Sequence, residues 1–293
     1  MTVFRATPAT ARSFGLAEGP VWDARRERVI WVDINAGAVH FGRLRGDTVS
    51  TDGQITLDGT VGAAVVSRRG ELLLAGTRHL HTVALDGTVT RGTELIPAGK
   101  ASRLNDGGCD PSGRFLVGSM ALDDRRHEES LARIEPAGRI TVIDDDLSLS
   151  NGLAFSADGA LLYSVDTTPG TVWSRSHDPA TGRFGPRGAF LHISDGSPDG
   201  LCLDAEGNLW IAIWGAGEVR CFTPSGAHIA TVEVAAPHTS SVAFVGPGLD
   251  TLLITTASEQ LSAARLARHP DSGRLFTARV GVAGLPVPYW VGP

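Results

Sequence analysis

The 293-residue chain has few cysteines, and it lacks long apolar runs. Cys109, Cys202 and Cys221 are odd in number and form no CxxC pair, which argues against a disulfide framework and against a structural zinc cage. No apolar run approaches the ~20 residues of a membrane helix. The stretch Met1 to Gly15 lacks the charged and apolar regions of a classical export signal. These absences predict a protein of the reducing cytoplasm that does not bind membranes.

An excess of positive charge is also missing. Lys and Arg number 26 against 32 Asp and Glu, which gives a formal net charge of -6. A nucleic-acid binder needs a basic stripe that displaces counterions, so no nucleic-acid partner is expected. Hydrophobic residues make up 42% of the chain and charged residues 20%, a composition typical of a globular protein that folds by itself.

Several well-known catalytic signatures are absent. The chain contains no HExxH metal motif, no GxSxG nucleophile elbow, and neither the GxGxxG nor the Walker spacing. The acidic stretch 144–150 lacks the Gly and the terminal Glu of an EF-hand loop. The stretch ALDDRRHEES, residues 121–130, can form a loop that closes over a ligand site or one that lies in solvent, and its charge density favours solvent.

An internal repeat is present. An apolar run, an Asp or Ser, two variable residues, a Gly and a second apolar run recur in AAVVSRRGELLLAG, GGCDPSGRFLVGS, GLAFSADGALLYSVD and GLCLDAEGNLWIAI. Two looser copies flank these four. Taking the turn residue as the register mark gives Arg26, Gly70, Gly113, Gly159, Gly207 and Asp250, spaced by 43 to 48 residues.

This spacing predicts the fold. Two β-rich runs around a tight glycine turn, usually followed by a third run, form a small antiparallel sheet that cannot bury both faces alone. Sheets repeating at ~40 to 50 residues are typical of a β-propeller. We therefore expect an all-β protein, a single six-bladed propeller domain over residues 1–293. Long helical periodicity is missing, and the best helix candidate, residues 261–268, is short enough to be a last strand.

The register also predicts a site. Eight residues before each mark lie Glu18, Gly62, Asn105, Asn151, Asp199 and Val242, on the strands that should line the central channel. A single Asp or Asn before Gly is explained by an Asx turn. Four carboxylates or carboxamides at one register favour a binding site, because such groups are costly to bury unless a cation satisfies their oxygens. Oxygen ligands suit Ca²⁺, Mg²⁺ or Mn²⁺ and also accept Zn²⁺ or Fe²⁺.

At these residues the sequence resembles the gluconolactonase/regucalcin (senescence marker protein) family. The matching segments span residues 16–257 in the family's order, and they are LAEGPVWD with IWVDI, RLNDGGCDPSGRFLVGSM, SNGLAFSADG with LLYSVDT, PDGLCLDAEGNLWIAIWGAGEV, and APHTSSVAF with LLITTA. The six-bladed propeller is also the fold that this resemblance implies.

The resemblance implies roles for individual residues. Glu18, Asn151 and Asp199 match the metal ligands, Arg103 and Asn105 match the substrate-contacting pair, and Asp123 takes the place of an acidic residue that touches sugar hydroxyls. Asp123 is one carbon shorter than the usual Glu, and Leu122 stands where another acid is common. The implied activity is opening of a sugar lactone, such as a glucono-, galactono-, xylono- or arabinonolactone, to the aldonic acid. A divalent ion would polarise the carbonyl, and Asp199 would be the general base.

Two alternatives stay open at this stage. One is a lactonase or esterase acting on a non-sugar ester, because a metal and one carboxylate do not specify the acyl group. The other is a Ca²⁺-binding regulatory protein of the regucalcin type. Arg103 and Asn105 favour a sugar lactonase over a pure ion binder. We expect a monomer or a small homo-oligomer.

Overall fold

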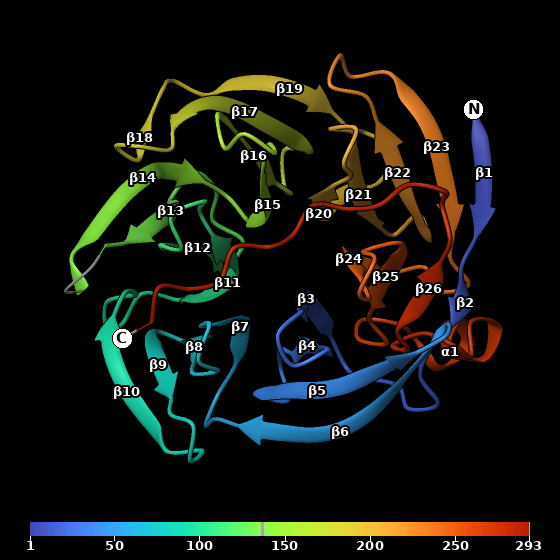
Figure 1. Cartoon of the computed structure of the whole chain (residues 1–293), viewed down its shortest axis with the longest axis horizontal. Coiled ribbons are helices and arrows are strands. Elements are labelled where there is room, and N and C mark those ends of the chain that lie inside the picture. Colours follow the sequence, from blue (N-terminus) through green and yellow to red (C-terminus); the bar gives the residue numbers. More distant parts are fainter. Residues whose placement is uncertain (136–137, 293) are drawn as a thin grey trace.

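The computed structural model describes residues 1–135 and 138–292, and it confirms the six-bladed β-propeller (Figure 1). Blade 1 contains β3 (Ala17–Asp23), β4 (Arg28–Asp33), β5 (Ala38–Arg45) and β6 (Thr48–Thr56). Blade 2 contains β7 (Val61–Val66), β8 (Leu72–Gly76), β9 (His79–Val83) and β10 (Val89–Glu94). Blade 3 contains β11 (Ser102–Cys109), β12 (Phe115–Ala121), β13 (Glu129–Ile134) and β14 (Ile140–Leu147).

The remaining blades use both ends of the chain. Blade 4 contains β15 (Ser150–Phe155), β16 (Leu161–Asp166) and β17 (Thr171–Asp178), flanked by β18 (Arg183–Phe184) and β19 (Gly188–His192). Blade 5 contains β20 (Ser197–Leu203), β21 (Leu209–Trp214), β22 (Glu218–Phe222) and β23 (His228–Glu233), with β1 (Thr2–Arg5) added in parallel. Blade 6 contains β24 (Thr239–Val245), β25 (Thr251–Thr256), β26 (Phe276–Ala278) and, outermost, β2 (Thr7–Pro8). The N-terminus therefore closes the ring.

The first hairpin of each blade turns as the repeat predicts. In four blades a glycine with positive φ occupies the turn, and its N–H donates back to the first turn residue, as from Gly207 to the carbonyl of Asp204 at 3.0 Å. In blade 6 the residue in that place is Leu249, with φ 50° and its N–H on the carbonyl of Gly246. The mark predicted at Asp250 was therefore one residue late. The sixth channel position is Ser241, and Val242 was wrong.

The segment 261–268 is not a strand. Residues Ala263–Arg268 form α1, whose first turn is capped by the Ser262 side chain accepting from the N–H of Arg265. The expectation of a last strand there was wrong because β26 and the N-terminal β2 complete blade 6 instead. Within the described part of the chain, no helix is long and apolar enough to span a membrane.

The core lies between the blades, with the inner strands around the axis and the C-terminal segment crossing the middle of the ring (Figure 1). That segment ties three blades together, because Gly284, Trp290 and Val291 donate their N–H groups to the carbonyls of Leu249, Val66 and Gly113 at 2.8, 2.9 and 3.0 Å. Cys109 and Cys221 are buried, Cys202 is half-buried, and all three are free thiols.

Candidate functional site

The six inner strands share an irregularity at one level of the channel. Each pairs with its neighbour through a register shift, and the shifts lie between Glu18 and Val21, Val61 and Ala63, Leu104 and Gly107, Asn151 and Leu153, Pro198 and Leu201, and Thr239 and Ser241. Bulges of this kind re-aim side chains and are common next to functional sites. The sequence register therefore marks a real structural level of the propeller.

Glycines let the inner strands come unusually close at this level. A Cβ on Gly62 would lie 2.5 Å from the carbonyl oxygen of Asn105, and a Cβ on Gly152 would lie 2.6 Å from that of Asp199. A Cβ on Gly200 would lie 2.0 Å from Ser241 Oγ. Only strands without side chains at these points can bring the polar groups of different blades into one cluster.

A chain of hydrogen bonds runs from blade 3 to blade 4 through the predicted residues. Arg103 Nη1 donates to Asn105 Oδ1 at 2.5 Å, and Asn105 Nδ2 donates to Asn151 Oδ1 at 2.7 Å and to the Ser150 carbonyl at 2.9 Å. Asn151 Nδ2 in turn donates to Thr167 Oγ1 at 2.8 Å. The amide of Asn151 is thereby oriented, and its oxygen keeps one lone pair for a further partner.

Three carboxylates share the same low-dielectric surroundings. Burial and the charge of Asp106 raise the pKa of Glu18 to about 8. Burial, followed by repulsion from Glu18 and Asp106, raises the pKa of Asp199 well above its ordinary range. Burial also raises the pKa of Asp106 to about 6. Two like charges next to one another in a buried site disfavour ionisation, so the positive charge near these carboxylates does not fully compensate them.

Arg103 provides part of that compensation. Burial lowers the pKa of Arg103 to about 10, while the neighbouring Glu18, Glu259 and Asp199 act in the opposite direction. Among the described residues Arg103 donates only through Nη1, to Asn105 and to the Leu104 carbonyl at 3.0 Å. One guanidinium thus faces several carboxylates and keeps N–H groups for a ligand.

The donors fit a divalent cation. Asp199 is 5% exposed and its Oδ1 has no hydrogen-bond partner among the described residues, while the Glu18 carboxylate accepts from the N–H of Gly19 at 3.0 Å. Residues 1–135 and 138–292 bring no three His, Cys, Asp or Glu side chains together as a metal cluster. The expected set of Glu18, Asn151 and Asp199 contains only two such residues, because its third member is a carboxamide. Two carboxylates and an amide oxygen make an all-oxygen donor set for a hard cation.

A cavity lies in the channel next to this level, on the side toward which the inner strands run. Its volume is ≈ 240 Å³, and its lining includes the polar residues Asp106 and Ser241 together with Leu153, Leu201 and Phe244. A larger hollow of ≈ 490 Å³ lies elsewhere, between the 67–71 turn and the C-terminal segment, where none of the channel residues contributes. The channel residues therefore meet a mostly apolar chamber beneath them.

Asp123 lies apart from the buried cluster, in the connection between β12 and β13. Its side chain is 46% exposed and forms an ion pair with Arg125 Nη1 at 2.8 Å. It comes two residues after Ala121, which pairs with Ser102 at the beginning of β11, so it lies at the end of the propeller where this inner strand begins. The loop, for which solvent exposure was favoured, is exposed at Asp123 but anchored at its end, since Glu129 is fully buried.

The sequence reasoning missed three polar residues of this region. Asp106 follows Asn105 directly in RLND, so its proximity was visible in the repeat. Ser241 was hidden by the misplaced mark at Asp250. Glu259, which accepts from Asn35 Nδ2 at 2.5 Å and stabilises the charge of Arg103, lies in an irregular segment that carries no repeat signal.

Comparison with known proteins agrees with the fold and with the spacing of these residues. Residues 16–258 match the family described as SMP-30/Gluconolactonase/LRE-like region. The chain is 34% identical over 281 residues to the 6-deoxy-6-sulfogluconolactonase of Pseudomonas putida, covering 94% of this chain and 95% of that one. It is 31% identical over 287 residues to chicken (Gallus gallus) regucalcin, covering 94% of both.

A solved structure is similar over almost the whole chain. The crystal structure described as a calcium-binding protein, regucalcin, from Agrobacterium tumefaciens superposes with a TM-score of 0.91 at 29% identity, covering 99% of each chain. The shared fold extends through all six blades. The chain belongs to the SMP-30/gluconolactonase/regucalcin family, whose members include sugar lactone lactonases.

Proposed function

We propose that this protein is a divalent-metal-dependent hydrolase that opens a sugar lactone to the aldonic acid. The observation that carries the proposal is the buried Asp199, whose Oδ1 has no partner in the part of the chain that the structure describes, while Glu18, Asn151 and Arg103 surround the same channel level. An unpaired, buried carboxylate oxygen is costly, which is expected at a site that binds a cation. The name of the Pseudomonas relative supports a lactone substrate.

Glu18, Asn151 and Asp199 would hold the metal ion. Ca²⁺, Mg²⁺, Mn²⁺, Zn²⁺ and Fe²⁺ all accept such oxygen ligands. When bound, a divalent ion supplies Lewis-acid polarisation of a carbonyl and lowers the pKa of a nearby water.

Asp199 is the proposed general base. Its carboxylate takes a proton from the water that attacks the lactone carbonyl carbon, and it returns that proton to the ring oxygen when the acyl C–O bond breaks. The products are one carboxyl and one hydroxyl group, so the sum is lactone plus water. Glu18 is the other carboxylate among the proposed ligands, and its Oε2 already accepts from the N–H of Gly19.

Arg103 and Asp123 would bind the sugar. Arg103 has N–H donors left for ring or exocyclic oxygens, and Asp123 offers a carboxylate to hydroxyl groups at the mouth. Asn105 uses both amide hydrogens within the protein, so it would contact substrate only as an acceptor through Oδ1. Its other task is to connect Arg103 with Asn151.

The test is metal removal and restoration. Protein treated with chelator would be given Ca²⁺, Mg²⁺, Mn²⁺, Zn²⁺ or Fe²⁺ separately, and acid release from five- and six-carbon aldonolactones would be followed above the spontaneous rate. Turnover should return with a metal and fall at least ~10³-fold in Asp199→Asn. In chelator the same variant should melt about 2–4 °C higher than the unaltered protein, because it removes a buried, unpaired charge.

The result also separates the competing functions. Metal binding without turnover on any lactone would contradict the proposal and favour a calcium-binding role, as described for the Agrobacterium regucalcin. Turnover of simple esters or acyl lactones in place of aldonolactones would identify a non-sugar substrate.

A further inference from the structure

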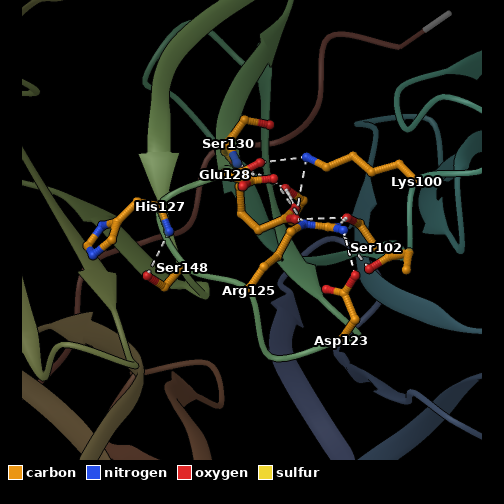
Figure 2. Close-up of polar contacts among 11 residues, drawn as sticks. Lys100, Ser102, Asp123, Arg125, His127, Glu128, Ser130 and Ser148 are labelled. Carbon is orange, nitrogen blue, oxygen red and sulfur yellow. Dashed lines mark hydrogen bonds and ion pairs between the residues drawn. The ribbon is translucent and has the colours of Figure 1, made fainter.

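The loop between β12 and β13 contains a charged network outside the proposed metal centre (Figure 2). Arg125 is at its centre, and its guanidinium contacts Asp123 Oδ2 at 2.8 Å, Ser102 Oγ at 2.5 Å and Glu129 Oε1 at 3.1 Å. It also donates to the Ala101 carbonyl at 2.9 Å. One side chain thus joins the exposed tip of the loop to the residues immediately before Arg103.

The network is anchored on Glu129. This fully buried carboxylate accepts from Ser102 Oγ on β11 at 2.7 Å and from Ser119 Oγ on β12 at 2.6 Å. Burial acts to raise the pKa of Glu129, but the bonds from Ser119, Ser102 and Arg125 outweigh it and hold that pKa below its usual value. The anchor is therefore ionised, and it fixes Arg125 against the beginning of the strand that carries the substrate-contacting pair.

The loop is held on its other side as well. Asp124 and His127 both have φ of 59°, a left-handed conformation that costs non-glycine residues about 1 kcal/mol or more. The N–H of His127 donates to Ser148 Oγ at 3.2 Å, in the connection to blade 4 (Figure 2). A strained loop tied at both sides has one shape, so the position of Asp123 is set before a ligand arrives.

We propose that Arg125 is a positioning residue for substrate recognition, which holds the carboxylate of Asp123 at the channel mouth in register with Arg103. This rests on the proposed lactonase function. Arg125 engages Oδ2 of Asp123, which leaves Oδ1 for a sugar hydroxyl. The Asp side chain is one carbon shorter than Glu. Held in one position by Arg125, it can accept hydrogen bonds from the distal hydroxyls of a polyhydroxylated lactone.

The test compares two lactones in the metal-loaded protein. Glucono-δ-lactone carries the distal hydroxyls, whereas δ-valerolactone has the same ring without them. In Arg125→Met the ratio of kcat/KM for gluconolactone to that for valerolactone should fall about tenfold, mainly through KM, because losing a contact that is equally strong in the ground state and the transition state raises KM. Asp123→Ala should give the same fall, and the double variant should fall no further.

Matched variants separate positioning from folding. Lys100 Nζ lies 3.4 Å from Glu129 Oε1, so a positive charge stays beside the buried carboxylate when Arg125 is replaced. Arg126→Met, an exposed arginine of the same loop, should keep the unaltered ratio, and Arg125→Lys should recover part of it. Asp123 is exposed, so its alanine variant tests the contact independently of the buried network.

Three results would overturn the proposal. They are an unchanged ratio in Arg125→Met, losses that multiply in the double variant, and an equal loss on both lactones together with a lowered melting temperature. If the unaltered protein opened neither lactone with any metal, the lactonase proposal would fail first, and this one with it.

Discussion

Asp199 illustrates a conflict between stability and binding at the scale of one residue. A buried carboxylate oxygen without a partner costs about 1–3 kcal/mol, and the charges of Glu18 and Asp106 add repulsion. A protein selected for stability alone would replace such a residue. Its presence at the level where six strands converge is the strongest residue-level argument for a bound cation.

His40 is a second buried group with unmet polar atoms. It is 0% exposed, neither ring nitrogen has a hydrogen-bond partner among the described residues, and its ring packs on Trp31 and Phe14 at 5.4 and 4.9 Å. Burial, with a smaller effect from Arg12, lowers its pKa from 6.5. The unfolded chain therefore binds the proton more readily, and stability falls as pH drops below about 6.5.

His40→Phe should remove this pH dependence while keeping the aromatic packing. The difference in melting temperature between about pH 7.5 and pH 5 should shrink by roughly 2–4 °C relative to the unaltered protein, measured by calorimetry. His192→Gln, at an exposed histidine, is the control and should leave that difference unchanged. Equal pH profiles for the His40 variant and the unaltered protein would contradict the assignment.

The channel residue of a blade could be located from the sequence where a glycine marks the turn of that blade's first hairpin. Gly113, Gly159 and Gly207 fix the register, so Asn105, Asn151 and Asp199 could be located from the sequence. Leu249 adopts the same left-handed conformation, but a leucine carries no signal for it, and Ser241 was missed. The partners of Glu129 could not be predicted either, because Ser102 and Ser119 are ordinary strand residues until the strands pair.

At the scale of elements, the inner strands owe their function to how closely they approach. β15 and β20 meet at Gly152, where a methyl group would clash with backbone atoms on both sides of Gly200, 2.6 Å from the Asp199 carbonyl and 2.6 Å from the Leu201 amide nitrogen. Backbone cannot move aside without moving Asp199 itself. This spacing is therefore required for packing and, under the proposed function, for catalysis.

Gly152→Ala should separate β15 from β20 and affect both properties. Overpacking costs about 1–3 kcal/mol, and the displaced Asp199 should lower lactone turnover at least ~10-fold. Gly188→Ala in β19 is a matched control, because nothing lies within 4 Å of its added methyl. Denaturant unfolding and turnover would be measured on both variants. A Gly152 variant as stable and active as the control would contradict the prediction, because it would show that β15 and β20 can move apart without loss.

The elements themselves were predictable from the repeat because each hairpin carries its own turn. The segment 261–268 was the exception. Its residues 263–268, AARLAR, are good helix formers. A blade needs an outer strand, however, and we expected the segment to supply it. The strand that satisfies this need, β2, lies more than 250 residues earlier in the chain, where no local pattern connects it with blade 6.

At the scale of the whole molecule, the first eight residues hold the ring closed. β1 extends blade 5 at an exposed edge, whereas β2 completes blade 6, which is adjacent to the blade that carries Glu18. A chain starting at Ala6 should lose only a few degrees of melting temperature, about 2–4 °C. A chain starting at Ala9 should lose more, and it should bind the activating metal more weakly.

Calorimetry and metal titration of both truncated chains would check this. Equal behaviour of the two would contradict the distinct role of β2. A protein that starts at Ala9 and keeps full metal affinity would show that blade 6 closes without its outer strand.

The closed ring also fixes when the protein becomes functional during its synthesis. Glu18 leaves the ribosome before the rest of the ring, while its neighbours in the ring, β24 to β26, are made after the other five blades have been started. Asp199 and Glu18 cannot face one another until the last blade has formed between them. A growing chain therefore has no site, and an incomplete one released early would expose unsatisfied carboxylates and an open blade edge, features that quality-control proteases can recognise.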